Sequence, residues 1–188
     1  MDRYSNEKKK MKILFISDIH GKITNLKYID DLIIKENFDK IVVLGDLYYS
    51  GFIENYEGIN PKLVKDLLMK YSDKIICLKG NCDSLVDIKT TDLPISDLAL
   101  IHVDNIDMYL THGDVYNIEN SSKFKNCILI YGHKHYPFIE KKNDMLYINV
   151  GSLSLPRNGS KCSYMIYENK TFTIYDMSGS IINSLSIK

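Results

Sequence analysis

The first 80 residues alternate between short apolar runs and longer segments with helical spacing. Residues 12–17, 41–44 and 74–78 are apolar runs typical of buried strands. Between them, residues 23–37 carry apolar side chains at helical spacing, and residues 60–70 form a second predicted helix with a proline in its first turn. Strands separated by helices indicate βαβ crossovers, and so predict a mainly parallel sheet.

From residue 98 the pattern changes to short strand-like segments separated by turns, which indicates a second sheet. We expect an α/β fold, a four-layer αββα sandwich of two mixed β-sheets flanked by helices. With no linker or repeat visible, residues 1–10 are expected to be a disordered extension and residues 11–188 a single domain. The predicted strands are residues 98–103, 108–111, 128–131, 146–150, 163–167 and 171–176, with residues 117–125 as a further helix.

The composition narrows the class of protein. A chain of 188 residues that is 45% hydrophobic can build one sizeable core. Basic and acidic residues balance at 24 each, so no stable nucleic-acid complex is expected, and no run approaches the ~20 apolar residues of a membrane span. The four cysteines show no close pairing, which favours a reduced cytoplasmic location.

Seven polar residues share one property, because each follows the end of a predicted strand. Since the carboxyl ends of parallel strands meet at one edge of a sheet, these side chains are expected to converge. A mixed set of carboxylate, amide and imidazole groups suits divalent ions such as manganese, iron or zinc. The seven residues are Asp18, His20, Asp46, Asn81, His112, His133 and His135.

The local spacing of these residues supports a metal site. Asp18 and His20 are two residues apart, so in extended chain both point to one side, and His133 and His135 repeat this arrangement. A single histidine is more often structural than a ligand. His102 lies inside a predicted strand and matches no ligand motif, so we expect it to be structural.

The motifs together resemble the calcineurin-like metallophosphoesterase superfamily. The segment Gly151-Ser-Leu-Ser-Leu-Pro-Arg157 is similar to the YfcE-like branch of small prokaryotic phosphodiesterases, and the likeness extends from about Met11 to the C-terminus. The motifs that carry it are Asp18-Ile-His-Gly21, Gly45-Asp46, Gly80-Asn-Cys-Asp83, Thr111-His-Gly-Asp114 and Gly132-His-Lys-His135.

This resemblance implies two divalent cations that share Asp46, at a separation of roughly 3.5 to 4 Å. Mn²⁺ is the first expectation, with Ni²⁺, Fe²⁺, Co²⁺ and Zn²⁺ as alternatives. The implied reaction is hydrolysis of a small phosphodiester by a hydroxide that bridges the cations. The implied ligands are Asp18, His20, Asp46 and His135 for one cation, and Asp46, Asn81, His112 and His133 for the other.

The resemblance also implies catalytic roles for Asn81, Cys82 and His112, and substrate contacts from Asn81, Cys82 and Arg157. Many relatives carry histidine at position 82, where it assists the substrate or leaving group. A thiol, with a reference pKa of about 8.5 against about 6.5 for imidazole, is a poorer proton donor, and nearby cations could make it a thiolate. We therefore expect better turnover of aryl diesters than of alkyl monoesters. Cys82 filling space beneath the site is the alternative.

Other possibilities remain open at this point. Ser152 or Cys82 as a covalent nucleophile is a weaker mechanism. A non-catalytic scaffold similar to Vps29, a phosphomonoesterase and a homo-oligomer are further hypotheses. Asp83 and Asp114 are either partners of the imidazoles or caps. Tyr48, Tyr49 and Phe52 are either stacking groups or surface residues. Lys134 is a candidate phosphate contact.

Overall fold

The computed structural model describes residues 10–48 and 58–187. The helices are α1 (Leu26–Glu36), α2 (Pro61–Lys70) and α3 (Leu85–Thr90). The strands are β1 (Lys12–Ile16), β2 (Lys40–Val43), β3 (Ile75–Leu78), β4 (Ile95–Ser96), β5 (Leu98–Val103), β6 (Ile106–Thr111), β7 (Ile128–Tyr131), β8 (Pro137–Lys142), β9 (Met145–Val150), β10 (Ser163–Glu168), β11 (Thr171–Asp176) and β12 (Ile181–Ser186).

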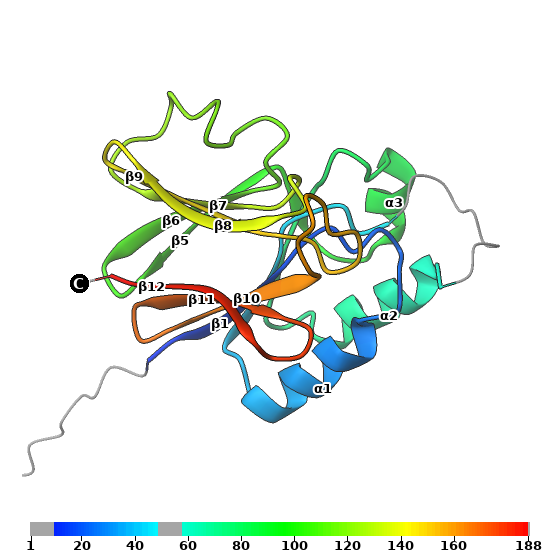
Figure 1. Cartoon of the computed structure of the whole chain (residues 1–188). Helices are drawn as coiled ribbons and strands as arrows, with labels where there is room; N and C mark the ends of the chain where they lie inside the picture. The colour runs from blue at the N-terminus through cyan, green and yellow to red at the C-terminus, as the bar shows by residue number, and fades with distance from the viewer. Residues whose placement is uncertain (1–9, 49–57, 188) are drawn as a thin grey trace, which may run out of the picture.

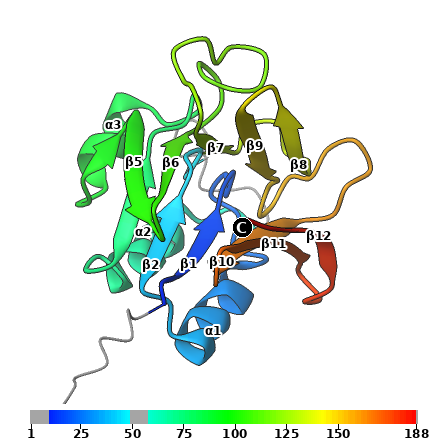
Figure 2. The same ribbon diagram turned by 90° about the vertical axis from the view of Figure 1, so that its left-hand side faces the viewer.

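Two mixed sheets lie one above the other, with α1 and α2 on the outer face of the first (Figure 1). The first has seven strands in the order β12-β11-β10-β1-β2-β3-β4, and the second has five in the order β5-β6-β7-β9-β8. The expected α/β sandwich of two mixed sheets is thereby confirmed. Figure 2 shows the same strands from the side.

The first sheet is parallel where helices connect its strands, from β1 to β4, and antiparallel from β1 through β10 and β11 to β12. The prediction that β10 and β11 belong to the second sheet is wrong, because β10 pairs with β1. In the second sheet, β6, β7 and β9 are parallel, and β5 and β8 close its edges in antiparallel pairing.

Alternating side chains of the central strands supply two cores. On β1, Leu14 and Ile16 pack with α1 and α2, whereas Ile13 and Phe15 pack between the sheets. All four are at most 1% exposed, so this strand is buried on both faces, as its continuous apolar run predicted. The core between the sheets fixes the strand ends relative to one another.

The predicted helix at residues 117–125 is wrong. This segment forms turns, in which the Asn117 Oδ1 accepts hydrogen bonds from the backbone N–H groups of Glu119 and Asn120. A short polar side chain thus replaces helical hydrogen bonds with local ones. Ile118 and Phe124 still pack on the outer face of the second sheet. The short elements α3, β4, β8 and β12 were not predicted.

Candidate metal centre

Every one of the seven predicted ligands lies beyond the carboxyl end of a strand, at the same edge of the sandwich. The first sheet supplies four: Asp18 and His20 after β1, Asp46 after β2 and Asn81 after β3. The second sheet supplies three: His112 after β6, and His133 and His135 after β7. The site is therefore built from both sheets.

Four of these side chains form a tight buried cluster. Donor atoms of Asp18, His20, Asp46 and His135 all lie within 4.8 Å of one another. The His135 Nε2 is 3.0 Å from the Asp18 Oδ1, and the two Nε2 atoms of His20 and His135 are 3.4 Å apart. Within the described residues, the buried Asp18 Oδ1 accepts no hydrogen bond. Carboxylate and imidazole lone pairs that converge in this way fit a divalent cation.

Asp46 connects this cluster to a second group of side chains. Its Oδ2 lies 3.5 Å from the Nε2 of His20 and 3.4 Å from the Nε2 of His112. The His112 Nε2 is also 3.1 Å from the Asn81 Oδ1, and the rings of His112 and His133 are 5.1 Å apart between centroids. One carboxylate oxygen thus lies between the two predicted ligand groups.

Backbone carbonyls orient two of the imidazoles. The His112 Nδ1 lies 2.7 Å from the carbonyl oxygen of Leu44, and the His135 Nδ1 lies 2.7 Å from that of Leu155. If each Nδ1–H donates to its carbonyl, each Nε2 presents its lone pair to the centre of the site. Hydrogen bonds of this kind are usual behind metal-binding histidines.

The buried carboxylates create a negative potential at this edge. Burial would lower the pKa of His112, but its hydrogen bond with Asp46 and the charges of Asp18 and Asp46 raise it to about 9. Burial would raise the pKa of Asp46, yet its contacts with His112 hold it well below the usual range. Burial lowers the pKa values of His20 and His133, so both imidazoles are neutral at pH 7, the form that binds metals.

Five of the seven residues have left-handed backbone conformations, which are uncommon outside glycine. The φ angles of Asp18, His20, Asp46, His133 and His135 lie between 51° and 63°. Such conformations cost about 1 kcal/mol or more each and persist only where the surrounding structure holds them. Their concentration at this edge is consistent with a candidate functional site there.

Glycines allow the ligand loops to approach one another closely. A Cβ at position 80 would collide with the Asp46 carboxylate, and a Cβ at position 132 would collide with the side chains of Ser17 and Asp18. These contacts explain why Gly80 and Gly132 precede ligands in the motifs.

Cys82 lies beside the cluster and is half-buried. Its backbone N–H donates to the Asp46 Oδ1 at 2.8 Å, and the Asn81 Nδ2 donates to its Sγ at 3.4 Å. Burial and the charge of Asp46 raise the pKa of the thiol to about 12. The protein groups by themselves therefore favour the neutral thiol.

The predicted alternatives for several neighbours are now resolved. Ser152 is completely buried and its hydroxyl donates to the carbonyl of Asp18, so it is no nucleophile. Among the described residues Asp83 makes no hydrogen bond to an imidazole, and it accepts hydrogen bonds from the backbone N–H groups of Leu47, Tyr48 and Gly80, as a turn cap does. His102 lies on β5 outside the site, 2.7 Å from the Asp107 carboxylate.

The residues expected at the mouth of the site differ in burial and in their contacts. The prediction for Tyr48 is wrong, because it is buried and its hydroxyl bonds to Thr91, whereas Tyr49 and Phe52 lie outside the described residues. Arg157 has an exposed side chain, and its backbone N–H donates to the carbonyl of His135. Lys134 pairs with Glu119.

The role of Ser154 was not predicted. Its hydroxyl bonds to the carbonyls of Asp18 and Ile19, and so supports the first ligand loop together with Ser152. The signal was present, since both serines follow the carboxyl end of β9 within the segment that carries the family resemblance.

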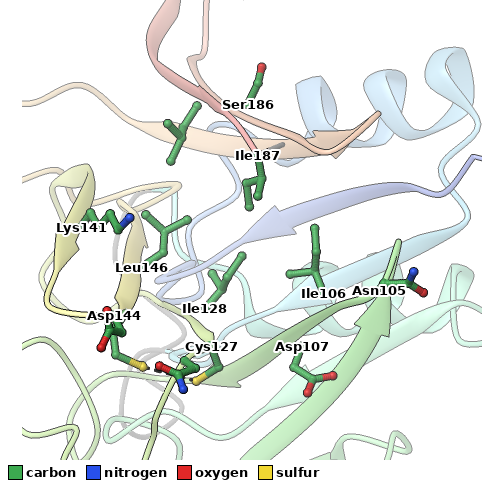
Figure 3. A pocket seen from close by; sticks show the side chains of 13 residues that line it. Asn105, Ile106, Asp107, Cys127, Ile128, Lys141, Asp144, Leu146, Ser186 and Ile187 are labelled. Carbon is green, nitrogen blue, oxygen red and sulfur yellow. Dashed lines mark hydrogen bonds between the residues drawn. The ribbon is translucent and has the colours of Figure 1, made fainter.

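A separate hollow of about 530 Å³ opens at the opposite end of the second sheet (Figure 3). Its lining includes Ile106, Ile128 and Leu146, near the amino ends of β6, β7 and β9, together with Ile187. None of the described residues that line it is a histidine, and it is not the metal centre.

None of the helices in the described parts of the chain has the length and apolar character of a membrane span.

Comparison with solved structures shows the fold in several proteins. The chain matches the phosphoesterase YfcE from Escherichia coli with a TM-score of 0.86 and 32% identity, covering 95% of this chain and 100% of that one. It matches Vps29 from Entamoeba histolytica, complexed with zinc, with a TM-score of 0.65 and 18% identity over 93% and 98% of the two chains, which shows the fold alone.

Sequence comparisons give the family. The chain is 32% identical to the phosphodiesterase YfcE of Escherichia coli over 181 residues, which cover 94% of this chain and 98% of YfcE. It is 26% identical to the phosphodiesterase MJ0936 of Methanocaldococcus jannaschii over 151 residues, 75% and 83% of the two chains. Residues 11–171 match the model of the calcineurin-like phosphoesterase superfamily domain. The resemblance found in the motifs is confirmed, and the chain belongs to the calcineurin-like phosphoesterase superfamily.

Proposed function

We propose that this chain is a phosphodiesterase that uses two divalent cations. The observation that carries the proposal is the position of Asp46, whose Oδ2 lies within 3.5 Å of the Nε2 of His20 and within 3.4 Å of that of His112. One carboxylate therefore faces a ligand from each predicted group. The names of the relatives YfcE and MJ0936 as phosphodiesterases support the substrate class.

Each group of side chains would hold one cation. Asp18, His20 and His135 would bind the first, Asn81, His112 and His133 the second, and Asp46 both. When bound, such a pair of cations supplies water of lowered pKa and neutralises charge on the phosphoryl oxygens. Mn²⁺ is the proposed ion, because a mixed oxygen and nitrogen set suits it, with Ni²⁺, Fe²⁺, Co²⁺ and Zn²⁺ as alternatives.

The remaining side chains bind and orient the phosphoester. Asn81 is exposed, so its amide can donate to a phosphoryl oxygen as well as contact His112. The guanidinium of Arg157 is a second donor for the substrate, since its backbone is anchored to His135. Cys82 offers a thiol in place of an imidazole, and both a neutral thiol and a thiolate formed beside the cations give little help to a poor leaving group. Diesters with acidic leaving groups are therefore the preferred substrates.

The test combines metal analysis with hydrolysis of bis(4-nitrophenyl) phosphate. Wild type is expected to bind divalent ions and cleave the diester. Asp46→Asn removes the shared charge, so turnover should fall by at least two orders of magnitude, the scale for loss of one electrostatic group in an active site. His102→Gln is the matched control, because His102 lies outside the site, and it should retain both properties.

A different result would favour the alternatives. If wild type binds no divalent ion and is as inert as Asp46→Asn with Mn²⁺, Ni²⁺, Co²⁺ and Zn²⁺, the enzyme proposal fails and a scaffold similar to Vps29 gains support. Faster turnover of 4-nitrophenyl phosphate than of the diester would favour a phosphomonoesterase.

We also propose a cytoplasmic location, which the four free cysteines support. Cell fractionation tests it, and recovery in an oxidising compartment would contradict it. Oligomeric state stays a prediction, which light scattering on the purified protein can test.

A further inference from the structure

A groove of about 320 Å³ opens beside Asn81. It lies between the loop after β3, the start of β5 and the loop after β6. The predicted ligand Asn81 itself lines the groove, so the groove adjoins the site. Its lining includes Asn81, Asp97, Leu98, Asp114, Val115 and Tyr116.

Two side chains on the lining of this groove are apolar and open to solvent. Leu98 is 41% exposed and Val115 is 53% exposed. Exposed apolar side chains in a hollow beside a polar site are typical of ligand contacts. Leu100, the next outward-facing residue of β5, is 52% exposed but does not line the groove.

The aromatic part of the wall is held rigidly. The Tyr116 ring meets the Phe124 ring edge to face, with 5.3 Å between centroids, and the Lys123 Nζ donates to the Tyr116 hydroxyl at 3.0 Å. The Asn117 Nδ2 donates to the carbonyl of Gly113 at 2.8 Å, which anchors this loop next to His112. A surface fixed in advance loses little entropy when a ligand binds.

The charges of the groove select against a second anionic group. Asp97 and Asp114 place two carboxylates on its lining, against the single ammonium group of Lys79. Carboxylates repel another phosphate, and they accept hydrogen bonds from hydroxyl or imide N–H groups. An uncharged, partly aromatic group with such donors fits both the walls and the charges.

We infer that this groove binds the substituent that remains on phosphorus, and that this substituent is a nucleoside. The inference rests on the proposed phosphodiesterase function. A volume of about 320 Å³ suits one nucleoside. The family resemblance implies that position 82 assists the substrate or leaving group, and Cys82 does not line the groove, so we assign the groove to the retained group.

In the reaction, the oxygen of water bonds to phosphorus and the bond to the leaving oxygen breaks with its electron pair. The proton of the water passes to solvent, and the product is a nucleoside monophosphate. The nucleoside therefore contacts the groove before and after cleavage.

Two diesters with the same leaving group test the inference. Methyl 4-nitrophenyl phosphate and thymidine 5′-(4-nitrophenyl phosphate) both release 4-nitrophenolate, so the ratio of their kcat/KM values reports the retained group. Wild type should prefer the thymidine ester by about tenfold or more, the effect of 1.4 kcal/mol of binding free energy. Leu98→Asp should reduce this ratio by about tenfold, because it adds a carboxylate to an apolar wall.

Leu100→Asp is the matched control, since it places the same charge two residues along the same exposed face, and it should leave the ratio unchanged. Val115→Asp tests the other exposed apolar side chain of the lining and should act like Leu98→Asp. A wild type without preference for the thymidine ester, or Leu98 and Leu100 variants with equal ratios, would overturn the inference.

A binding measurement keeps this inference separate from the proposed function. In Zn²⁺-loaded protein with ¹³C-labelled methyl groups, thymidine 5′-monophosphate should shift the methyl signals of Leu98 and Val115, whereas inorganic phosphate should not. If no diester is cleaved with any metal and these shifts occur, the function fails and the groove stands. If the shifts are absent, the groove is not a nucleoside site.

Discussion

The two halves of the predicted ligand set differ in how far they are enclosed. Asp18, His20 and His135 are each at most 4% exposed. In the other half His112 is also buried, at 1% exposed, but Asn81 is exposed and His133 is half-buried. The enclosed half can hold a cation with protein atoms on most sides. The open half leaves directions free for a phosphoester, and the groove beside Asn81 extends from that half.

The hydrogen bonds that hold the ligands also differ between the two halves. On the enclosed side, the Asp18 Oδ2 accepts a hydrogen bond from the backbone N–H of His133, and the hydroxyls of Ser152 and Ser154 hold the Asp18 carbonyl. On the open side, the Asn81 side chain bonds only to its neighbours Cys82 and His112 among the described residues. In the proposed function, rigid binding of an ion and access for substrate would thus be divided between the two halves.

Replacing one imidazole in each half should give the largest difference in divalent-ion affinity between two variants. His135→Ala is expected to lower divalent-ion affinity by on the order of 10²-fold, the upper end of effects around metal sites, because it removes a buried nitrogen that water cannot easily replace. His133→Ala should cost less, since solvent can reach its position. Competition with a chelating dye measures both affinities, and a greater loss for His133→Ala would contradict the comparison.

Removal of metal should destabilise the whole protein. An ion present at 100 times its dissociation constant stabilises the native state by about 2.7 kcal/mol. For a chain of this size, the melting temperature should then fall by roughly 5 to 10 °C on addition of a chelator. Calorimetry measures the shift, and His135→Ala should show little of it. An equal shift in that variant would mean that the ion binds elsewhere.

Cys82→His alters a residue beside the open half, and it should change the turnover of substrates with poor leaving groups. Imidazole has a reference pKa of about 6.5 and donates a proton more readily than the thiol of Cys82, whose pKa is raised to about 12. Turnover of diesters with alkyl leaving groups should rise by roughly tenfold or more, with little change for aryl diesters. Steady-state kinetics on the two substrate types check this, with Cys82→Ser as the control. A uniform change for both types would show that Cys82 only fills space.

Ser154→Ala should have the smallest effect of these changes. It removes a hydroxyl that supports the enclosed half and should lower the free energy of unfolding. Its hydroxyl bonds to the carbonyls of Asp18 and Ile19, so its loss should reduce the free energy of unfolding by about 1 kcal/mol. Ser184→Ala removes a hydroxyl contact between β12 and β11 and should cost a similar amount. Urea denaturation measures both. Only Ser154→Ala should also weaken metal binding, and equal metal affinities would refute a positioning role.

The strand ends, and with them the edge where the ligands meet, could be predicted from the sequence. Continuous apolar runs such as residues 12–17 marked the strands, and a polar residue directly after each run marked its end. The helix at residues 117–125 was wrong because its spacing was helical while Asn117 makes local hydrogen bonds to the backbone. Propensity is a weak guide where a polar side chain can replace helical bonds.

Other features depend on contacts between distant segments. The pairing of β10 with β1 joins residues about 150 positions apart, which alternation of polar and apolar residues does not specify. The left-handed conformations of His133 and His135 follow from the fixed positions of neighbouring loops, not from their own preferences. Burial of Tyr48 likewise reflects its hydroxyl contact with Thr91.

The origin of the ligands in both sheets has a consequence for folding. His135 comes from the second sheet and Asp18 and His20 from the first, so a cation held by the three is a cross-link between the sheets. It can form only after the sheets have packed, and it must break before they separate. Ion binding should therefore slow global unfolding and leave early folding events unchanged. A bound ion would thus raise the kinetic stability of the native state.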